Sequence, residues 1–184
     1  MSEPKVGSDN IDWNNHWSNV QTEITDAMVK ELEWTFNSLP KGKFQILEVG
    51  CGPARYCRAW TEIGGEYFGI DFSDVAIEKA KILHPNNFFI CANNYEVSIF
   101  GRMFDVIFTN THLQHVANMN KNFLFEEFRK VLSQDGILIL ANEKDDVDSN
   151  TTMTYDKFKS FVEGHGFKLE AYAGTNKGYI FRKL

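Results

Sequence analysis

The stretch that decides the fold is Ile46-Leu47-Glu48-Val49-Gly50-Cys51-Gly52-Pro53-Ala54-Arg55. With the two residues before it, its first part forms a short apolar run over 44–49, which is typical of a buried β-strand. Gly50 and Gly52 let the backbone turn tightly and approach a ligand closely. A helix is predicted to follow, up to about Ile63, with its first N–H groups pointing at that ligand. The stretch therefore predicts a strand, a tight ligand-binding turn and a helix.

Strands and helices alternate through the middle of the chain. Short apolar runs predict further strands at 67–70, 87–91, 104–109 and 137–141. Helical periodicity predicts helices at 73–83, where Ser73 can act as the N-cap, and at 120–132. This alternation implies βαβ units and therefore a mostly parallel sheet with right-handed crossovers.

The two ends of the chain depart from this pattern. Apolar residues recur at near-helical spacing over 14–39, which predicts one helix that ends before Pro40. At the other end, a helix is predicted over 154–163 and strands over 167–172 and 178–182. The turn between these strands is short, so they must be antiparallel. We expect one domain over the whole chain, with a tail and helical lid at 1–42 and a core at 43–184.

Asp71 is the second signal for a ligand site. It ends the predicted second strand and lies 19 residues after Gly52. An acid at this place can accept hydrogen bonds from both ribose hydroxyls of a nucleoside cofactor. The alternative is an acid that only stabilises the start of the next helix through the helix dipole. Its position after the glycine turn favours the cofactor interpretation.

Together these motifs resemble the class I S-adenosylmethionine-dependent methyltransferases. The resemblance rests on Glu48-x-Gly50-x-Gly52-x-Ala54, Gly69-x-Asp71-x-Ser73, the strand at 104–108 and the segment 129–138. It implies a Rossmann-like three-layer α/β sandwich with a seven-stranded, mostly parallel sheet that ends in a C-terminal antiparallel hairpin. It also implies S-adenosylmethionine as cofactor, contacted by Glu48, Gly50, Cys51, Gly52, Asp71 and Phe72.

The sequence departs from the family pattern at two places. Ala54 replaces the third glycine, which we expect to be tolerated at a helix start. The usual acid after the third strand is absent, and Cys91-Ala92-Asn93-Asn94 stands there instead. The resemblance places Ala92 and Asn93 near the adenine, with Asn94 as an alternative to Asn93, or the segment is simply a polar loop.

The end of the fourth strand carries two histidines, in Asn110-Thr111-His112-Leu113-Gln114-His115. The resemblance implies that Asn110 and Thr111 touch the methionine portion of the cofactor. His115 matches a histidine found in small-molecule methyltransferases, and an imidazole can take a proton from an acceptor hydroxyl or amine. His112 is the second candidate for this role. The two histidines have no third metal ligand, so no metal site is predicted here. The carboxylates of the acidic run at 143–148 could hold a cation such as magnesium, but a solvated loop is the favoured interpretation.

Trp13 and Trp17 stand four residues apart before the strand–helix alternation, so on a helix they share one face. One interpretation is that they fix the first helix to the flank of the sheet. The other is a lid that covers the cofactor and walls the acceptor pocket. We expect the lid, with this segment more mobile when no ligand is bound.

Composition narrows the functional class. The net charge of −6 argues against nucleic-acid binding. The polar N-terminus has no signal-peptide core, and no apolar stretch reaches membrane-spanning length. Three cysteines without a C-x-x-C pair suggest reduced thiols. We therefore expect a cytoplasmic monomer or homodimer that does not bind a membrane.

The alternative to a methyltransferase is a nicotinamide-dependent dehydrogenase, which also uses a glycine turn and an acid. Arg55 stands at the third glycine position of G-x-G-x-x-G, and we expect no second catalytic domain within these 184 residues. The sequence therefore predicts an S-adenosylmethionine-dependent methyltransferase that acts on an O or N atom of a small molecule. A peptide or protein acceptor, or a partner subunit that binds the cofactor without catalysis, are the alternatives.

Overall fold

A computed structural model describes residues 10–20, 27–116, 118–142, 155–174 and 178–184. The acidic run 143–148, most of the predicted tail, the middle of the predicted first helix and most of the last turn lie outside these residues. Among the residues that are described, no helix is both long enough and apolar enough to cross a bilayer.

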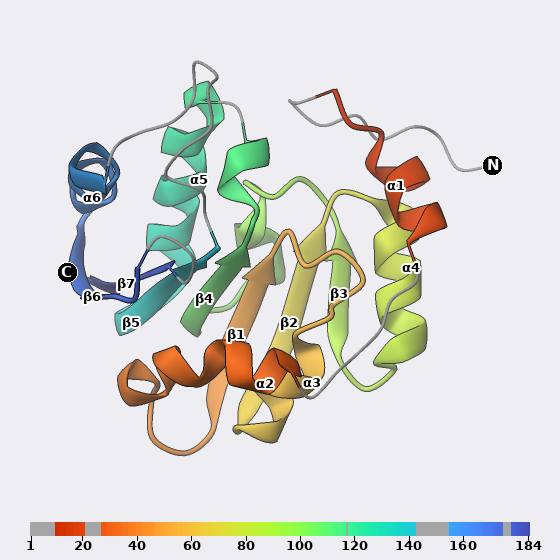
Figure 1. Cartoon of the computed structure of the whole chain (residues 1–184), viewed down its shortest axis with the longest axis horizontal. Helices are drawn as coiled ribbons and strands as arrows, with labels where there is room; N and C mark the ends of the chain where they lie inside the picture. Colours follow the sequence, from red (N-terminus) through yellow and green to blue (C-terminus); the bar gives the residue numbers. More distant parts are fainter. Residues whose placement is uncertain (1–9, 21–26, 117, 143–154, 175–177) are drawn as a thin grey trace.

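One sheet runs through the molecule. Its strands are β1 (Phe44–Val49), β2 (Gly65–Asp71), β3 (Phe88–Cys91), β4 (Phe104–Asn110), β5 (Leu132–Ala141), β6 (Phe167–Tyr172) and β7 (Gly178–Lys183). The strand order is β3-β2-β1-β4-β5-β7-β6 (Figure 1). The first five strands pair in parallel, and β7 runs antiparallel to both β5 and β6. The predicted sheet with its antiparallel end is confirmed.

Helices cover the sheet on both sides. They are α1 (Trp13–Asn19), α2 (Ala27–Leu32), α3 (Cys57–Glu62), α4 (Asp74–Leu83), α5 (Asn118–Val131) and α6 (Tyr155–Glu163), with short 3-10 helices η1 (Glu33–Ser38), η2 (Val97–Phe100) and η3 (Leu113–His115). Successive β1 side chains enter different cores: Ile46 packs with residues of α2, α3 and α4, and Leu47 packs with residues of α5 and α6. The three-layer arrangement is therefore confirmed.

The prediction of one helix over 14–39 is wrong. α1 ends at Asn19, and Val20 has an extended backbone with φ −88° and ψ 125°. The Lys79 ammonium, on α4, bonds to the carbonyl oxygens of Trp17 and Val20, so it satisfies acceptors at this helix end. α1 lies against α4 at the edge of the molecule (Figure 1). A contact with a distant element overrides the local periodicity here.

The glycine turn is longer than predicted. α3 begins at Cys57, and Ala54 lies before it with a left-handed φ of 58° instead of at a helix start. Two turns bridge the gap, with hydrogen bonds from Ala54 N to Cys51 O at 2.9 Å and from Cys57 N to Ala54 O at 3.1 Å. A left-handed backbone costs a non-glycine residue about 1–2 kcal/mol. It is therefore the turn, not the start of a helix, that faces the ligand site.

Candidate functional site

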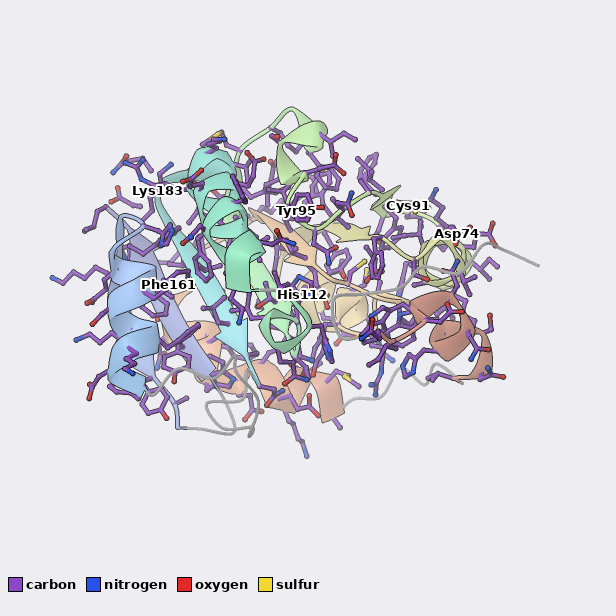
Figure 2. The ribbon with its side chains drawn as sticks, turned by 90° about the horizontal axis from the view of Figure 1, so that it is seen from above. Asp74, Cys91, Tyr95, His112, Phe161 and Lys183 are labelled. Carbon is purple, nitrogen blue, oxygen red and sulfur yellow. The ribbon has the colours of Figure 1, made fainter. Side chains whose placement is uncertain are left out.

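A cavity of about 540 Å³ lies at the carboxyl ends of β1, β2 and β4. This is the edge of an open α/β sheet where ligands bind, and the volume falls in the range of roughly 300–1,000 Å³ typical of small-molecule pockets. Figure 2, which views the molecule from above, labels His112 and Tyr95 at this cavity. The predicted site residues that line it are Trp13, Trp17, Glu48, Gly50, Cys51, Gly52, Asp71, Phe72, Asn93, Asn110, Thr111, His112 and His115.

The Asp71 carboxylate holds the glycine turn against the end of β2. Its Oδ2 accepts a hydrogen bond from Gly52 N at 2.9 Å, and its Oδ1 accepts one from Ser73 N at 2.9 Å. Burial raises the pKa of Asp71 to about 6, and backbone hydrogen bonds from Ser73, Gly52 and Phe72 oppose this rise. Asp71 is therefore mainly ionised at neutral pH. A carboxylate accepts about four hydrogen bonds, so Asp71 keeps acceptor capacity for a ligand hydroxyl beside these backbone donors.

Gly50 and Gly52 leave room for two aromatic rings. Both have positive φ, +71° and +52°. A Cβ on Gly50 would lie 2.5 Å from His112 Nδ1, and one on Gly52 would lie 2.8 Å from Trp17 Cζ2. The turn is thus a cradle without side chains, with the His112 and Trp17 rings beside it, and any other residue at either position would clash.

Glu48 forms the buried base of the cavity. Its Oε2 accepts a hydrogen bond from the Tyr67 hydroxyl at 2.6 Å. Burial raises the pKa of Glu48 to about 8, and this hydrogen bond opposes the rise. Glu48 is therefore mainly protonated at neutral pH. Burial, helped by the charge of Asp71, also raises the pKa of Cys51, so this thiol stays protonated and is a poor nucleophile.

The ionisation of Glu48 predicts a pH-dependent stability. Between its ordinary pKa of 4.5 and its folded pKa of about 8, the unfolded chain has lost the proton that the folded chain keeps. Glu48 therefore makes the free energy of unfolding fall as pH rises through this window, whereas His112, whose pKa is lowered from 6.5 to about 3 by burial, gives the opposite trend below about pH 6.5. Asp71 contributes the same trend as Glu48 only up to about pH 6. Glu48→Gln is expected to flatten the fall between about pH 6 and 8, measured by denaturant titration.

The matched control is Glu66→Gln, which removes an exposed acid from β2. This variant is expected to keep the wild-type slope. An equal slope in Glu48→Gln and the wild type would contradict a protonated Glu48 in the folded protein.

α1 covers one side of the cavity and is held by Asn14. The Asn14 amide is buried, donates to Asp74 Oδ1 at 2.7 Å and accepts from the Ser73 hydroxyl at 2.6 Å. The Trp13 ring meets the His115 ring edge-on, with centroids 4.9 Å apart. The first helix is therefore docked on the start of α4, with both tryptophans lining the cavity.

The two histidines have different environments. Burial, with a smaller contribution from His115, lowers the pKa of His112 to about 3, so its ring is neutral at pH 7 and a weak base. His115 lies in η3, and its Nε2 is 3.1 Å from the Gln114 amide nitrogen. In the described part of the chain, no three His, Cys, Asp or Glu side chains are grouped so that they could hold a metal.

Some residues differ from the sequence-based expectations. Ala92 does not line the cavity, because its side chain packs against the core beneath α5. Several further residues line the cavity that were not predicted from the sequence: Pro53, Arg55, Tyr56, Tyr95, Val116 and Asn120. Pro53, Arg55 and Tyr56 lie in the turn between Gly52 and α3, so their place after the glycine motif was a usable signal. Asn120 on α5 carried none, because only the tertiary fold brings it here.

The profile of the Methyltransferase domain family matches residues 47–140, which is about half of the chain. The malonyl-[acyl-carrier protein] O-methyltransferase of Buchnera aphidicola is 23% identical over 68% of this chain and 48% of its own length. The phosphoethanolamine N-methyltransferase of Plasmodium falciparum is 27% identical over 92% of this chain and 63% of its own length. The chain spans about half the length of several curated relatives it matches.

A solved structure shows the same fold. The TehB-like S-adenosylmethionine-dependent methyltransferase of Corynebacterium glutamicum superposes with a TM-score of 0.68 at 17% identity, covering 94% of each chain. The family match includes the end of β1, the glycine turn, Asp71 and β4, which together build the cavity. The chain therefore belongs to the Methyltransferase domain family, and its fold is that of the class I S-adenosylmethionine-dependent methyltransferases.

Proposed function

We propose that this protein transfers a methyl group from S-adenosylmethionine to an O or N atom of a small-molecule acceptor. The observation that carries the proposal is the cavity in which the Asp71 carboxylate, the glycine turn and the end of β4 meet. The names of the relatives describe both O- and N-methylation, which supports either acceptor atom.

The chain's own residues fit the cofactor. Asp71 would accept hydrogen bonds from the ribose hydroxyls, and Phe72 and Asn93 would lie near the adenine. Asn110 would contact the methionine portion beside the cradle. When bound, S-adenosylmethionine supplies a methyl group on a positively charged sulfur that leaves readily.

Positioning and exclusion of water are the main contributions that the protein makes to such a transfer. Correct alignment of two reactants supplies roughly 7–11 kcal/mol of barrier reduction. Trp13 and Trp17 would exclude water from the acceptor, because α1 places both rings in the cavity wall. His115 lines the same wall and is proposed to contact the acceptor.

Turnover of purified protein tests the proposal. The protein is incubated with methyl-labelled S-adenosylmethionine and, in separate arms, a small-metabolite extract and a peptide mixture. We expect S-adenosylhomocysteine and a labelled product in the metabolite arm. Product only in the peptide arm would show that the acceptor is a peptide or protein and not a small molecule. Binding of S-adenosylhomocysteine without any turnover would indicate a partner subunit, and no binding at all would overturn the cofactor as well.

A further inference from the structure

Tyr56 brings a phenolic hydroxyl to the cavity, although no sequence motif marks this residue. Tyr56 lies in the turn before α3, lines the cavity and is 7% exposed. Its ring meets the Phe108 ring edge-on, with centroids 5.3 Å apart, so the side chain is fixed by the core beneath it. The hydroxyl therefore has a defined place beside the end of β4.

Two hydrogen bonds orient this hydroxyl. It donates to Glu31 Oε2 at 2.5 Å, and it accepts from Asn110 Nδ2 at 3.2 Å. The Asn110 amide is held in turn by Asn142, whose Nδ2 donates to Asn110 Oδ1 at 2.8 Å. A phenolic hydroxyl donates one hydrogen bond and can also accept. Because the Tyr56 proton is directed at Glu31, the oxygen faces Asn110 and the cavity as an acceptor, and a group that enters the cavity can share or replace the 3.2 Å bond from Asn110.

Glu31 connects this hydroxyl to solvent. It lies on α2, where Met28 and Leu32 are buried against the core, while Glu31 itself is exposed. Tyr56 is on the cavity side of the pair, and Glu31 is on the solvent side. The two side chains therefore form a short path along which a proton can pass from the cavity to water.

We propose that Tyr56 and Glu31 together remove the proton from the methyl acceptor. This inference rests on the proposed function and extends it. The acceptor's lone pair attacks the methyl carbon, and the sulfur–methyl bond breaks with its electron pair remaining on sulfur. The acceptor's proton moves to the Tyr56 oxygen while the Tyr56 proton moves to the Glu31 carboxylate. Glu31 then releases its proton to water.

The properties of Tyr56 suit a relay better than an ionised base. Burial, followed by the hydrogen bond and charge of Glu31, raises the pKa of the Tyr56 hydroxyl, so it stays protonated at rest. In a concerted transfer the hydroxyl gains one proton as it loses another and never carries a full charge. The histidines are less suited, since the pKa of His112 is about 3 and His115 Nε2 already has the Gln114 amide beside it.

Glu31→Gln separates proton transfer from positioning. The side-chain amide oxygen that this substitution introduces still accepts the Tyr56 hydrogen bond, but it cannot take the proton. We expect kcat to fall by about 10²-fold or more, since general bases contribute 10²–10⁴-fold. KM for S-adenosylmethionine and the affinity for S-adenosylhomocysteine should stay unchanged. Rates are measured as S-adenosylhomocysteine formation, with the metabolite fraction that supports wild-type turnover as acceptor.

Three further variants complete the test. Glu31→Asp keeps a carboxylate and should recover part of kcat, and Tyr56→Phe should lose it as Glu31→Gln does. Glu33→Gln removes a neighbouring exposed acid and should behave as wild type. If the wild type turns over and Glu31→Gln keeps an undiminished kcat, the relay is wrong. The proposed function then stands, and His115 remains the predicted base. A wild type that forms no S-adenosylhomocysteine with any acceptor overturns the proposed function and the relay with it.

Discussion

Replacing Asp71 by alanine is expected to weaken the binding of S-adenosylhomocysteine by at least about tenfold. The substitution would remove two hydrogen bonds to an ionised acceptor, each worth about 1.5–3 kcal/mol, and about 1.4 kcal/mol corresponds to tenfold in affinity. It would also release Gly52 N and Ser73 N, which Asp71 holds at 2.9 Å, so the melting temperature should fall. Calorimetry measures the affinity. The control is Asp156→Ala, which removes an exposed acid from α6 and should leave the affinity unchanged.

A change in the ligand separates direct binding from damage to the turn. If Asp71 contacts the ribose, the wild type should prefer S-adenosylhomocysteine to its 2′-deoxy analogue, and Asp71→Ala should lose this preference. Wild-type affinity should also decrease as pH falls through about 6, because the neutral acid is a weaker acceptor. An equal preference in the variant and the wild type would remove Asp71 from the ribose site.

The double substitution of Trp13 and Trp17 by alanine is expected to abolish turnover and leave the fold intact. Both rings line the cavity, and Trp17 lies directly over Gly52. Their loss would open the site to water and remove aromatic surface that buries about 150–250 Å² per ring. Phe123→Ala, which removes an exposed aromatic ring from α5, should keep wild-type activity. Full activity in the double variant would contradict a role for α1 in catalysis.

Hydrogen exchange distinguishes a lid from a fixed helix. α1 is only seven residues long and is held mainly by Asn14 and Lys79. Short terminal segments with few buried contacts open at low free-energy cost. Amides of residues 13–19 should therefore gain protection when S-adenosylhomocysteine binds. Equal protection with and without the ligand would contradict the lid and support the alternative, in which Trp13 and Trp17 only fix the helix to the flank of the sheet.

Local sequence was sufficient for most of the sheet. The apolar run at 44–49 and the alternating segment 167–172 match β1 and β6 in full, because a strand buried on both faces needs an apolar run and a strand buried on one face needs only alternate apolar residues. Ser73 was correctly predicted as an N-cap, since its hydroxyl accepts from Ala76 N at 3.2 Å. The start of β5 was missed by five residues, because α5 passes directly into β5 at Leu132 and the pairing is irregular there.

The cofactor half of the site was also predictable. Glu48, Gly50, Gly52 and Asp71 lie at the carboxyl ends of adjacent parallel strands, and this topology alone brings such positions together. The acceptor half was less predictable. His115 was identified through its place after β4, whereas Tyr56 and its partner Glu31 are 25 residues apart and share no motif.

The sequence by itself determined the strand–helix alternation of the core, the glycine turn and the acid opposite it, because the turn and Asp71 depend on spacing within one strand–helix–strand unit. Only the tertiary structure decided where α1 ends, the left-handed backbone of Ala54 and the pairing of Asn14 with Ser73. The first and the last of these features follow from contacts between residues distant in sequence, Lys79 with α1 and Ser73 with Asn14. Periodicity and propensity describe one segment at a time, so they carry no information about which partner will satisfy a helix end or orient a hydroxyl.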